Sequence, residues 1–206
     1  YMCLLGWAPG NDIEIFDREF AISKFDLNNV LPNPAIFDTT KLLWMNGQYI
    51  RNIEEDKFSK LAVQKITTDI TRDLFDSELE RLHKILPSVQ ERLETLNDLT
   101  PQIKFLLDEP FIIDQTDWEN VNSEDGQQYL FRIREKFKNL EKFSLENIEN
   151  LMREELKDME IKPKVGFQIT RVSITGTKIS PPLFESIYAL GKEGTVARLA
   201  ETIEKL

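Results

Sequence analysis

The sequence is poor in the residues that form disulfides or bind transition metals. It contains one cysteine, Cys3, and one histidine, His83, among 206 residues. A single cysteine excludes a disulfide within the chain. One cysteine and one histidine are also too few for a typical His/Cys metal site, which needs three or four such ligands. Both counts fit a reducing compartment, so we expect a cytoplasmic protein.

Long apolar runs and the loops of common catalytic sites are missing as well. No apolar run approaches the ~20 residues that a membrane-spanning helix needs, so we expect no membrane partner. There is no glycine-rich phosphate loop, no G-x-S-x-G turn and no C-x-x-C pair. His83 lies between Arg81 and Lys84 with no nucleophile to activate, which favours a surface histidine over a base. The sequence therefore predicts no active site, cofactor or metal in this chain.

Charge is abundant, and negative charge prevails. The chain holds 36 Asp and Glu against 26 Lys and Arg, a net charge of −10, which argues against a nucleic-acid partner and against DNA in particular. Residues 161–184 are the exception, because they contain no acid and four bases: Lys162, Lys164, Arg171 and Lys178. Such a stretch can attract a polyanion locally. The alternative is a chance gap between acidic helices, and charge alone favours this alternative.

Hydrophobic periodicity predicts a mostly helical protein. Apolar residues recur at steps of three and four from Phe58 to Ile70 and again from Leu79 to Leu96. The second half of the chain shows the same helical spacing of apolar residues. Such stripes are typical of core faces and carry no functional weight. Residues 165–175 are different, because they are rich in β-branched residues and alternate like a strand. No second strand is available nearby, so the pattern leaves this segment unassigned.

The N-terminal quarter predicts an irregular segment with two short helices. A helix over residues 17–25 would turn three apolar side chains inward: Phe20, Ile22 and Phe25. A second helix would begin at residues 38–40, where Asp-Thr-Thr offers an N-cap, and would end at residues 46–47, because Asn-Gly favours a turn.

Four motifs, taken in order, point to a family. Residues 4–7 read L-L-G-W and are followed by E-I-F at 14–16, residues 37–51 fit F-D-x-x-K-L-x-W-x-N-x-x-Y-I-R, residues 92–96 fit R-x-x-T-L, and residues 174–193 contain I-T-G, S-P-P-L-F-E and L-G-K-E. From Leu4 to its last residue, the chain resembles bacterial glutamyl-tRNA synthetases in motif order and spacing. Each motif alone is only modestly specific for the family, whereas four motifs in the family's order and spacing are strong evidence for the resemblance.

The resemblance implies a truncated enzyme. The family's catalytic motifs, an H-x-G-H-type sequence and a K-M-S-K-S-type loop, belong upstream of Leu4, and the chain begins at Tyr1 within an apolar run. We therefore expect a C-terminal portion that is inactive alone. Its parent enzyme would join glutamate to its tRNA using ATP and Mg²⁺. The expected partner is glutamate tRNA, contacted at its anticodon loop and stem by a monomer.

The resemblance also implies the fold and its divisions. Residues 1–55 would be the end of a stem-contact domain. Residues 56–110 and 111–206 would be two sub-bundles of a helical anticodon-binding domain. The fold class would be all-α, a helical cage, which makes residues 165–175 a helix against their alternation.

Arg92 is the sharpest functional expectation, because it begins the R-x-x-T-L motif. In the family, the arginine at this place reads the third anticodon base and accepts cytosine over guanine. The chemistry is sensible, since a guanidinium offers only donors, cytosine presents acceptors at O2 and N3, and guanine presents an N1–H. The mismatch corresponds to about 1–3 kcal/mol. Without the motif, a surface ion pair with Glu91 or Glu94 would be the simpler interpretation.

Further tRNA contacts are implied around the C-terminal motif. Arg171 precedes I-T-G by three residues, where the family often has an arginine facing the anticodon loop. Ser180 and Leu183 lie at the S-P-x-L-F turn, which would pack against an anticodon base, although Ser180 suits a helix N-cap equally well. Arg153 aligns with another anticodon contact, but no local motif supports it.

The N-terminal signature implies contacts with the tRNA stem. Lys41 and Arg51 are the candidates, and Lys41 is preferred because Arg51 could serve the fold instead. Trp44 and Tyr49 are expected in the core. A rival interpretation remains, a helical protein–protein interaction module without an RNA partner. The net charge of −10 favours this rival, whereas the acid-free stretch and the four motifs favour the synthetase.

Overall fold

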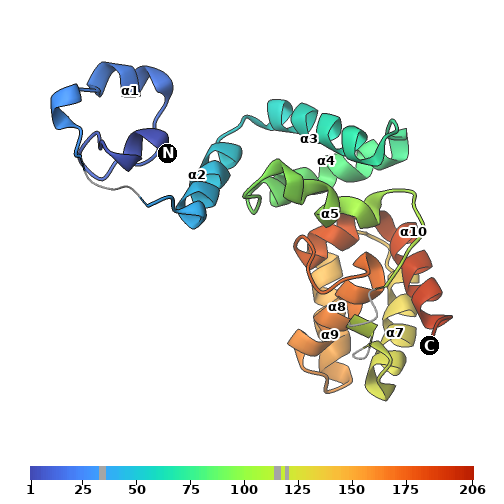
Figure 1. Cartoon of the computed structure of the whole chain (residues 1–206). Coiled ribbons are helices and arrows are strands. Elements are labelled where there is room, and N and C mark those ends of the chain that lie inside the picture. Colours follow the sequence, from blue (N-terminus) through green and yellow to red (C-terminus); the bar gives the residue numbers. More distant parts are fainter. Residues whose placement is uncertain (33–35, 114–116, 119–120) are drawn as a thin grey trace.

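The computed structural model describes residues 1–32, 36–113, 117–118 and 121–206, and these residues form helices and no strand. The all-α expectation is confirmed for this part of the chain. Figure 1 shows α1 and α2 at the N-terminal end of the molecule, α3, α4 and α5 next to them, and a bundle of α7 to α10 beyond. Within the described ranges, no helix is long and apolar enough to cross a membrane.

The N-terminal segment contains short helices joined by turns. They are η1 (Met2–Leu5), α1 (Arg18–Lys24), η2 (Leu27–Asn29) and α2 (Thr39–Arg51). The Asp38 carboxylate accepts a hydrogen bond from the Lys41 N–H at 2.9 Å, so the N-cap predicted within residues 38–40 is confirmed and is Asp38. The predicted end at residues 46–47 is wrong, because α2 continues to Arg51.

Apolar side chains of this segment are more exposed than their pattern predicts. Ile22 is 68% exposed, so its inward placement is wrong, whereas the half-exposed Phe25 has its ring centre 5.6 Å from that of Trp7. Trp44 and Tyr49 are 41% and 43% exposed, so their placement in the core is wrong too. The physical reason is size, because a segment this small has too few residues to cover both faces of its helices. Its own small core forms around the buried Trp7 ring.

The middle of the chain is a compact helical layer. It comprises α3 (Glu55–Ile70), α4 (Asp76–Gln90), η3 (Leu96–Asp98), α5 (Leu99–Ile103) and η4 (Lys104–Leu106). The predicted stripes are its core, since the following side chains are buried: Phe58, Ala62, Ile66, Leu82, Leu86 and Val89. Spacings of three and four bring these residues to one face of each helix.

The C-terminal bundle contains α7 (Glu124–Lys138), α8 (Leu145–Asp158), α9 (Pro163–Thr175) and α10 (Leu183–Ile203). Residues 165–175, which alternate like a strand, lie within α9, as the resemblance implied. Gly191 has φ 81° and ψ 168°, so α10 is two helical pieces joined at this residue. Helix α10 packs against α7, α8 and α9 of its own bundle and against α4 of the middle layer.

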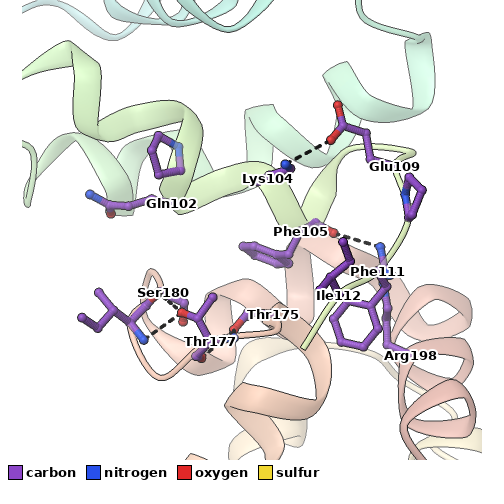
Figure 2. A pocket seen from close by; sticks show the side chains of 13 residues that line it. Gln102, Lys104, Phe105, Glu109, Phe111, Ile112, Thr175, Thr177, Ser180 and Arg198 are labelled. Atoms are coloured by element: carbon purple, nitrogen blue, oxygen red, sulfur yellow. Dashed lines mark hydrogen bonds and ion pairs between the residues drawn. The ribbon is translucent and has the colours of Figure 1, made fainter. Parts of the chain in front are cut away.

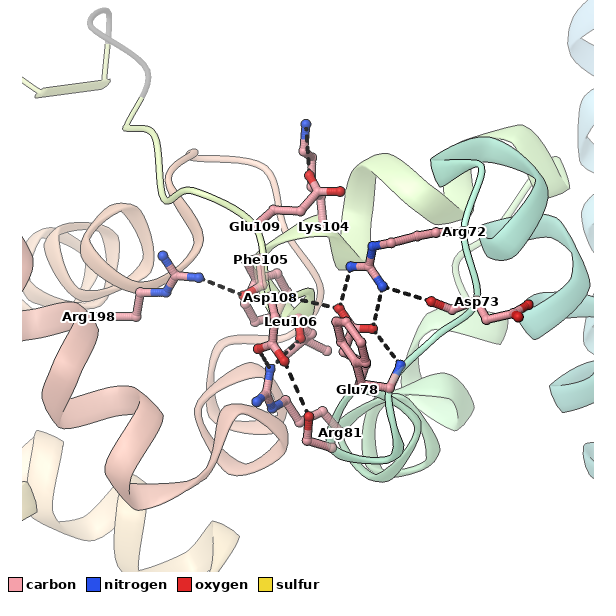
Figure 3. Close-up of polar contacts among 12 residues, drawn as sticks. Arg72, Asp73, Glu78, Arg81, Lys104, Phe105, Leu106, Asp108, Glu109 and Arg198 are labelled. Carbon is pink, nitrogen blue, oxygen red and sulfur yellow. Dashed lines mark hydrogen bonds and ion pairs between the residues drawn. The ribbon is translucent and has the colours of Figure 1, made fainter.

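The connector after η4 joins the middle layer to the C-terminal bundle and is held from both sides (Figure 3). From α4, the Arg81 guanidinium donates to the Leu106 carbonyl and to the Asp108 carboxylate, each at 2.7 Å. From α10, the Arg198 guanidinium donates to the Phe105 carbonyl at 3.5 Å and lies 4.3 Å from the centre of the Phe111 ring. The two helical units therefore share a tightly bonded junction.

Gly176 ends α9 and provides a test of the packing at this junction. A Cβ at Gly176 (φ +83°) would lie 2.4 Å from the Ile112 carbonyl oxygen, whereas a Cβ at Gly191 (φ +81°) would have nothing within 4 Å. In both variants, alanine must adopt a left-handed backbone conformation, which lowers the free energy of unfolding by about 1–2 kcal/mol each. Only Gly176→Ala also overpacks, so we expect it to lower the free energy of unfolding by about 1–3 kcal/mol more than Gly191→Ala. Equal losses in denaturant unfolding would contradict this.

Candidate nucleic-acid interface

Arg92 lies on the turn that follows α4. Its neighbour Leu93 is fully buried, whereas Arg92 itself is exposed. Within the described part of the chain, neither Glu91 nor Glu94 forms an ion pair with it. The surface ion pair that the sequence offered as an alternative is therefore wrong, and all guanidinium donors of Arg92 are available to a ligand.

Arg171 projects from α9 and is half-buried. One of its terminal nitrogens donates to the Pro181 carbonyl at 2.7 Å, to the Ser180 carbonyl at 3.3 Å and to the Ser180 hydroxyl. Ser180 is not a helix N-cap, because α10 begins at Leu183 and Pro182 occupies the cap position. The serine hydroxyl is instead part of a clamp by which Arg171 holds the turn over residues 180–182.

Arg92 and Arg171 come from different helical units, and their positive charges are close enough to interact. The pKa of Arg171 is lowered from its ordinary value, first because burial disfavours the charged form and then because the positive charge of Arg92 is close; Glu185 acts in the opposite direction. Two guanidinium groups that repel each other create a local positive potential in an acidic protein. Such a site suits a phosphate or the acceptor edge of a base.

Leu183 and Arg153 lie behind this turn rather than on it. Leu183 is buried in the hydrophobic core, so it supports the turn from below. The Phe184 and Phe167 rings meet edge to face at 5.4 Å, and the Arg153 guanidinium lies 5.3 Å from the centre of the Phe167 ring. Arg153 also donates to the Glu149 carboxylate at 2.7 Å, so its charge is already paired.

The two predicted stem contacts lie at opposite ends of α2. Lys41, near the start of the helix, forms an ion pair with Glu14. Arg51, its last residue, donates from a terminal nitrogen to the Glu91 carbonyl at 3.2 Å. This hydrogen bond fits the structural role that the sequence allowed for Arg51. The structure joins Arg171 to Ser180, places the positive charge of Arg92 near Arg171, and leaves Lys41 in the N-terminal segment.

A pocket of about 320 Å³ borders Ser180 (Figure 2). One wall comes from the end of α9 and the loop after it, with Thr175, Thr177 and Ile179, and the facing wall comes from α5 and η4, with Gln102 and Phe105. Lys104 and Arg198 add positive charge to the lining. Nothing in the sequence marks this pocket, because its walls are far apart in the chain and residues 101–112 carry no motif. In the ranges that the structure describes, no group of His, Cys, Asp or Glu could hold a metal ion.

Comparisons with known proteins agree on one family. Residues 57–203 match the family model described as "Anticodon binding domain". The chain is 33% identical over 206 residues to "Glutamate--tRNA ligase 2" of Caldicellulosiruptor saccharolyticus, covering 100% of this chain and 42% of that protein. It is 36% identical over 203 residues to "Glutamate--tRNA ligase" of Cutibacterium acnes, covering 93% of this chain and 40% of that protein.

A solved structure has the same fold. The crystal structure of a glutamate tRNA ligase from Elizabethkingia meningosepticum superposes with a TM-score of 0.83 at 24% identity, over 98% of this chain and 39% of that chain. At this identity, the likeness shows the fold alone. The chain spans 42% of the length of the Caldicellulosiruptor relative and 40% of the length of the Cutibacterium relative.

Proposed function

The chain belongs to the anticodon binding domain family, and we propose that it binds the anticodon arm of glutamate tRNA as part of a glutamate–tRNA ligase. The observation that carries the proposal is the clamp by which Arg171 holds the turn at residues 180–182, with the positive charge of Arg92 close to it. Both arginines begin or precede motifs of the resemblance. Their convergence in space supports a common ligand with acceptor edges or phosphates.

In this proposal, the chain recognises unstacked bases of the anticodon loop. Sequence-specific RNA binding mostly targets single-stranded loops, whose bases are read at their Watson–Crick edges and held by packing. Arg92 would read the third anticodon base with its free donors. The Ser180 turn, supported by Leu183 and held by Arg171, would pack against another base, and the pocket beside it offers apolar walls from Phe105 and Ile179.

The parent enzyme in this proposal ligates glutamate to its tRNA in the cytoplasm, as a monomer, using ATP and Mg²⁺. ATP and Mg²⁺ would bind the portion of that enzyme outside this chain. Residues 1–55 would end the stem-contact domain, with Lys41 toward the tRNA stem. Residues 56–110 and 111–206 would be the two anticodon-binding sub-bundles, and Arg153 would contribute at the periphery of the second.

The direct test is binding of transcribed glutamate tRNA by filter retention or gel shift at low salt. We expect saturable binding that weakens as salt rises, because phosphate contacts release counterions. A tRNA of unrelated anticodon is the control for non-specific attraction. The rival, a protein–protein interaction module, predicts equal and negligible binding of both tRNAs by this acidic chain, with net charge −10.

Arg171→Ala tests the second arginine. We expect weaker binding of every tRNA that the chain binds, because the clamp on Ser180 and Pro181 is lost together with a positive charge. If Arg171 also contacts a phosphate, the salt slope should fall by up to about one unit. Lys138→Ala removes one exposed positive charge from the end of α7 and is the control. Unchanged affinity and unchanged slope would remove Arg171 from the interface.

A further inference from the structure

We propose that helix α2 positions Arg92, and that Asn46 and Gly47 are the residues of α2 that hold the turn carrying Arg92 in place. The inference rests on the proposed function, in which Arg92 reads the third anticodon base. Asn46 and Gly47 would not touch RNA. They would hold the backbone of the turn over residues 91–95, so that the exposed guanidinium meets the base in one place.

Hydrogen bonds from α2 reach the turn on both sides of Arg92. The Asn46 side-chain amide donates to the Glu94 carbonyl at 2.6 Å, and the Arg51 guanidinium donates to the Glu91 carbonyl at 3.2 Å. The two acceptors bracket Arg92 in the chain. A turn held at both carbonyls cannot rotate about its own axis without breaking one of these bonds, so the direction of the Arg92 side chain is set from α2.

Gly47 allows the close approach that these bonds require. A Cβ at this position would lie 3.0 Å from the Leu93 carbonyl oxygen and 3.2 Å from a terminal nitrogen of Arg51. Glycine inside a helix costs about 0.5–1 kcal/mol relative to alanine, so a buried helical glycine usually has a packing reason. At Gly47 the reason is contact between the backbone of α2 and the backbone next to Arg92.

The bonding between α2 and α4 runs in the other direction as well. The buried side-chain amide of Gln90, the last residue of α4, donates to the Ile50 carbonyl at 2.9 Å and to the Ile53 carbonyl at 2.8 Å. Beyond the turn, the Asp98 carboxylate accepts from the Thr95 N–H at 2.9 Å and so closes its far end. Hydrogen bonds in both directions therefore join the ends of α2 and α4 to the turn between α4 and η3.

Helix α2 also links two proposed contacts along the tRNA. It carries Lys41, the predicted stem contact, at one end and grips the Arg92 turn near the other. One rigid helix then sets the separation between a stem contact and a base-reading contact. The positions of Asn46 and Gly47, between these two sites, fit a role in specificity rather than in affinity.

The experiment compares glutamate tRNA with the same tRNA carrying guanine at its third anticodon position. For Asn46→Ala and Gly47→Ala, we expect the ratio of the two dissociation constants to fall about twofold to thirtyfold. Asn46→Ala removes a donor, whereas Gly47→Ala keeps every donor, favours the helix and crowds the Leu93 carbonyl and the Arg51 guanidinium. The two variants therefore displace the same turn by independent routes, and one remains informative if the other fails to fold.

Two further variants separate the possible outcomes. Asn97→Ala removes an exposed amide just beyond the turn and should leave the ratio unchanged. In Arg92→Gln/Asn46→Ala, the second change should cause no further loss of discrimination, because coupled residues are not additive. If Arg92→Gln alone leaves the ratio unchanged, the proposed function fails. If Arg92→Gln lowers the ratio while both α2 variants retain it, at whatever melting temperature, the positioning role is overturned.

Discussion

Replacing Arg92 with glutamine is expected to remove most of the preference for cytosine over guanine at the third anticodon position. A guanidinium presents donors only, which suit the O2 and N3 acceptors of cytosine and leave the N1–H of guanine unpaired. A glutamine amide has a donor and an acceptor and can turn to suit either base. The discrimination at stake is about 1–3 kcal/mol, roughly tenfold to hundredfold in the ratio of affinities.

The structure makes this substitution a clean one. Arg92 is exposed and has no ion-pair partner in the described ranges, so Arg92→Gln should change stability by no more than about 0.5 kcal/mol. Binding of glutamate tRNA should stay within a modest factor, while binding of glutamine tRNA, which carries guanine at that position, should increase. Arg18→Gln removes the same charge from an exposed arginine on α1 and is the matched control.

The decisive quantity is the ratio of dissociation constants for the two tRNAs at one salt concentration. Charge loss alone would weaken both tRNAs equally, as expected for Arg18→Gln, and would leave the ratio unchanged. A ratio that is the same for wild type and Arg92→Gln would exclude Arg92 from base recognition.

The sequence predicted the elements whose signals are local. The N-cap of α2 at Asp38 and the core face of α3, with Phe58 and Ile66, follow from one residue and its near neighbours. These features are set by side-chain chemistry and helical spacing. They do not depend on tertiary contacts with the rest of the chain, so they can be predicted without a structure.

The sequence pattern could not assign α9, and the reason is burial. Both Ile169 and Thr170 are buried, as are Val172, Ser173 and Ile174, so apolar and small residues surround nearly the whole helix. Burial on several sides leaves few polar residues to mark the helical period, and the β-branched residues then imitate a strand. Only the resemblance to a known family predicted it correctly.

The resemblance names the residues of the candidate interface but not their geometry. Arg92 and Arg171 follow from motifs, whereas the clamp from Arg171 to the turn at Ser180 depends on two segments meeting in space. Asn46 and Gly47 show the same limit. As a dipeptide they favour a turn, but the Glu94 and Leu93 carbonyls nearby make them the docking face of a continuous helix.

Glu78→Gln is expected to destabilise the fold strongly, because the carboxylate of Glu78 is surrounded by donors. Glu78 is fully buried on α4, and Figure 3 shows the groups around its carboxylate. The Arg72 guanidinium donates to both carboxylate oxygens, at 2.7 and 2.8 Å. The Phe75 N–H donates at 2.9 Å and the Asp108 N–H at 2.7 Å.

These bonds connect Glu78 to the junction between the helical units. Its bond to the Asp108 N–H fixes the start of the connector, and Arg81 fixes the Leu106 carbonyl and the Asp108 carboxylate beside it. A neutral amide in place of the carboxylate would place an NH₂ group against existing donors. Breaking a buried ion pair from one side costs about 3–5 kcal/mol, because the remaining charge loses its partner.

The same group predicts a dependence of stability on pH. Hydrogen bonds from Arg72, and then from the backbone N–H groups of Asp108 and Phe75, lower the pKa of Glu78 from 4.5 to about 2 against the opposing effect of burial. Because the pKa is lower in the folded state, the carboxylate stabilises the fold fully above pH 4.5, and this contribution disappears as the pH falls toward 2. Its size is about 3 kcal/mol.

Denaturant unfolding of wild type and Glu78→Gln at about pH 7, and at intervals down to about pH 2.5, measures both effects. At neutral pH the variant should be less stable by about 3–5 kcal/mol, and the difference should shrink as acid neutralises Glu78 in the wild type. Glu80→Gln, an exposed carboxylate on the same helix, should change stability by no more than about 0.5 kcal/mol. A difference between wild type and Glu78→Gln that stays constant over the whole pH range would show that the bonds to Glu78 act through packing and not through its charge.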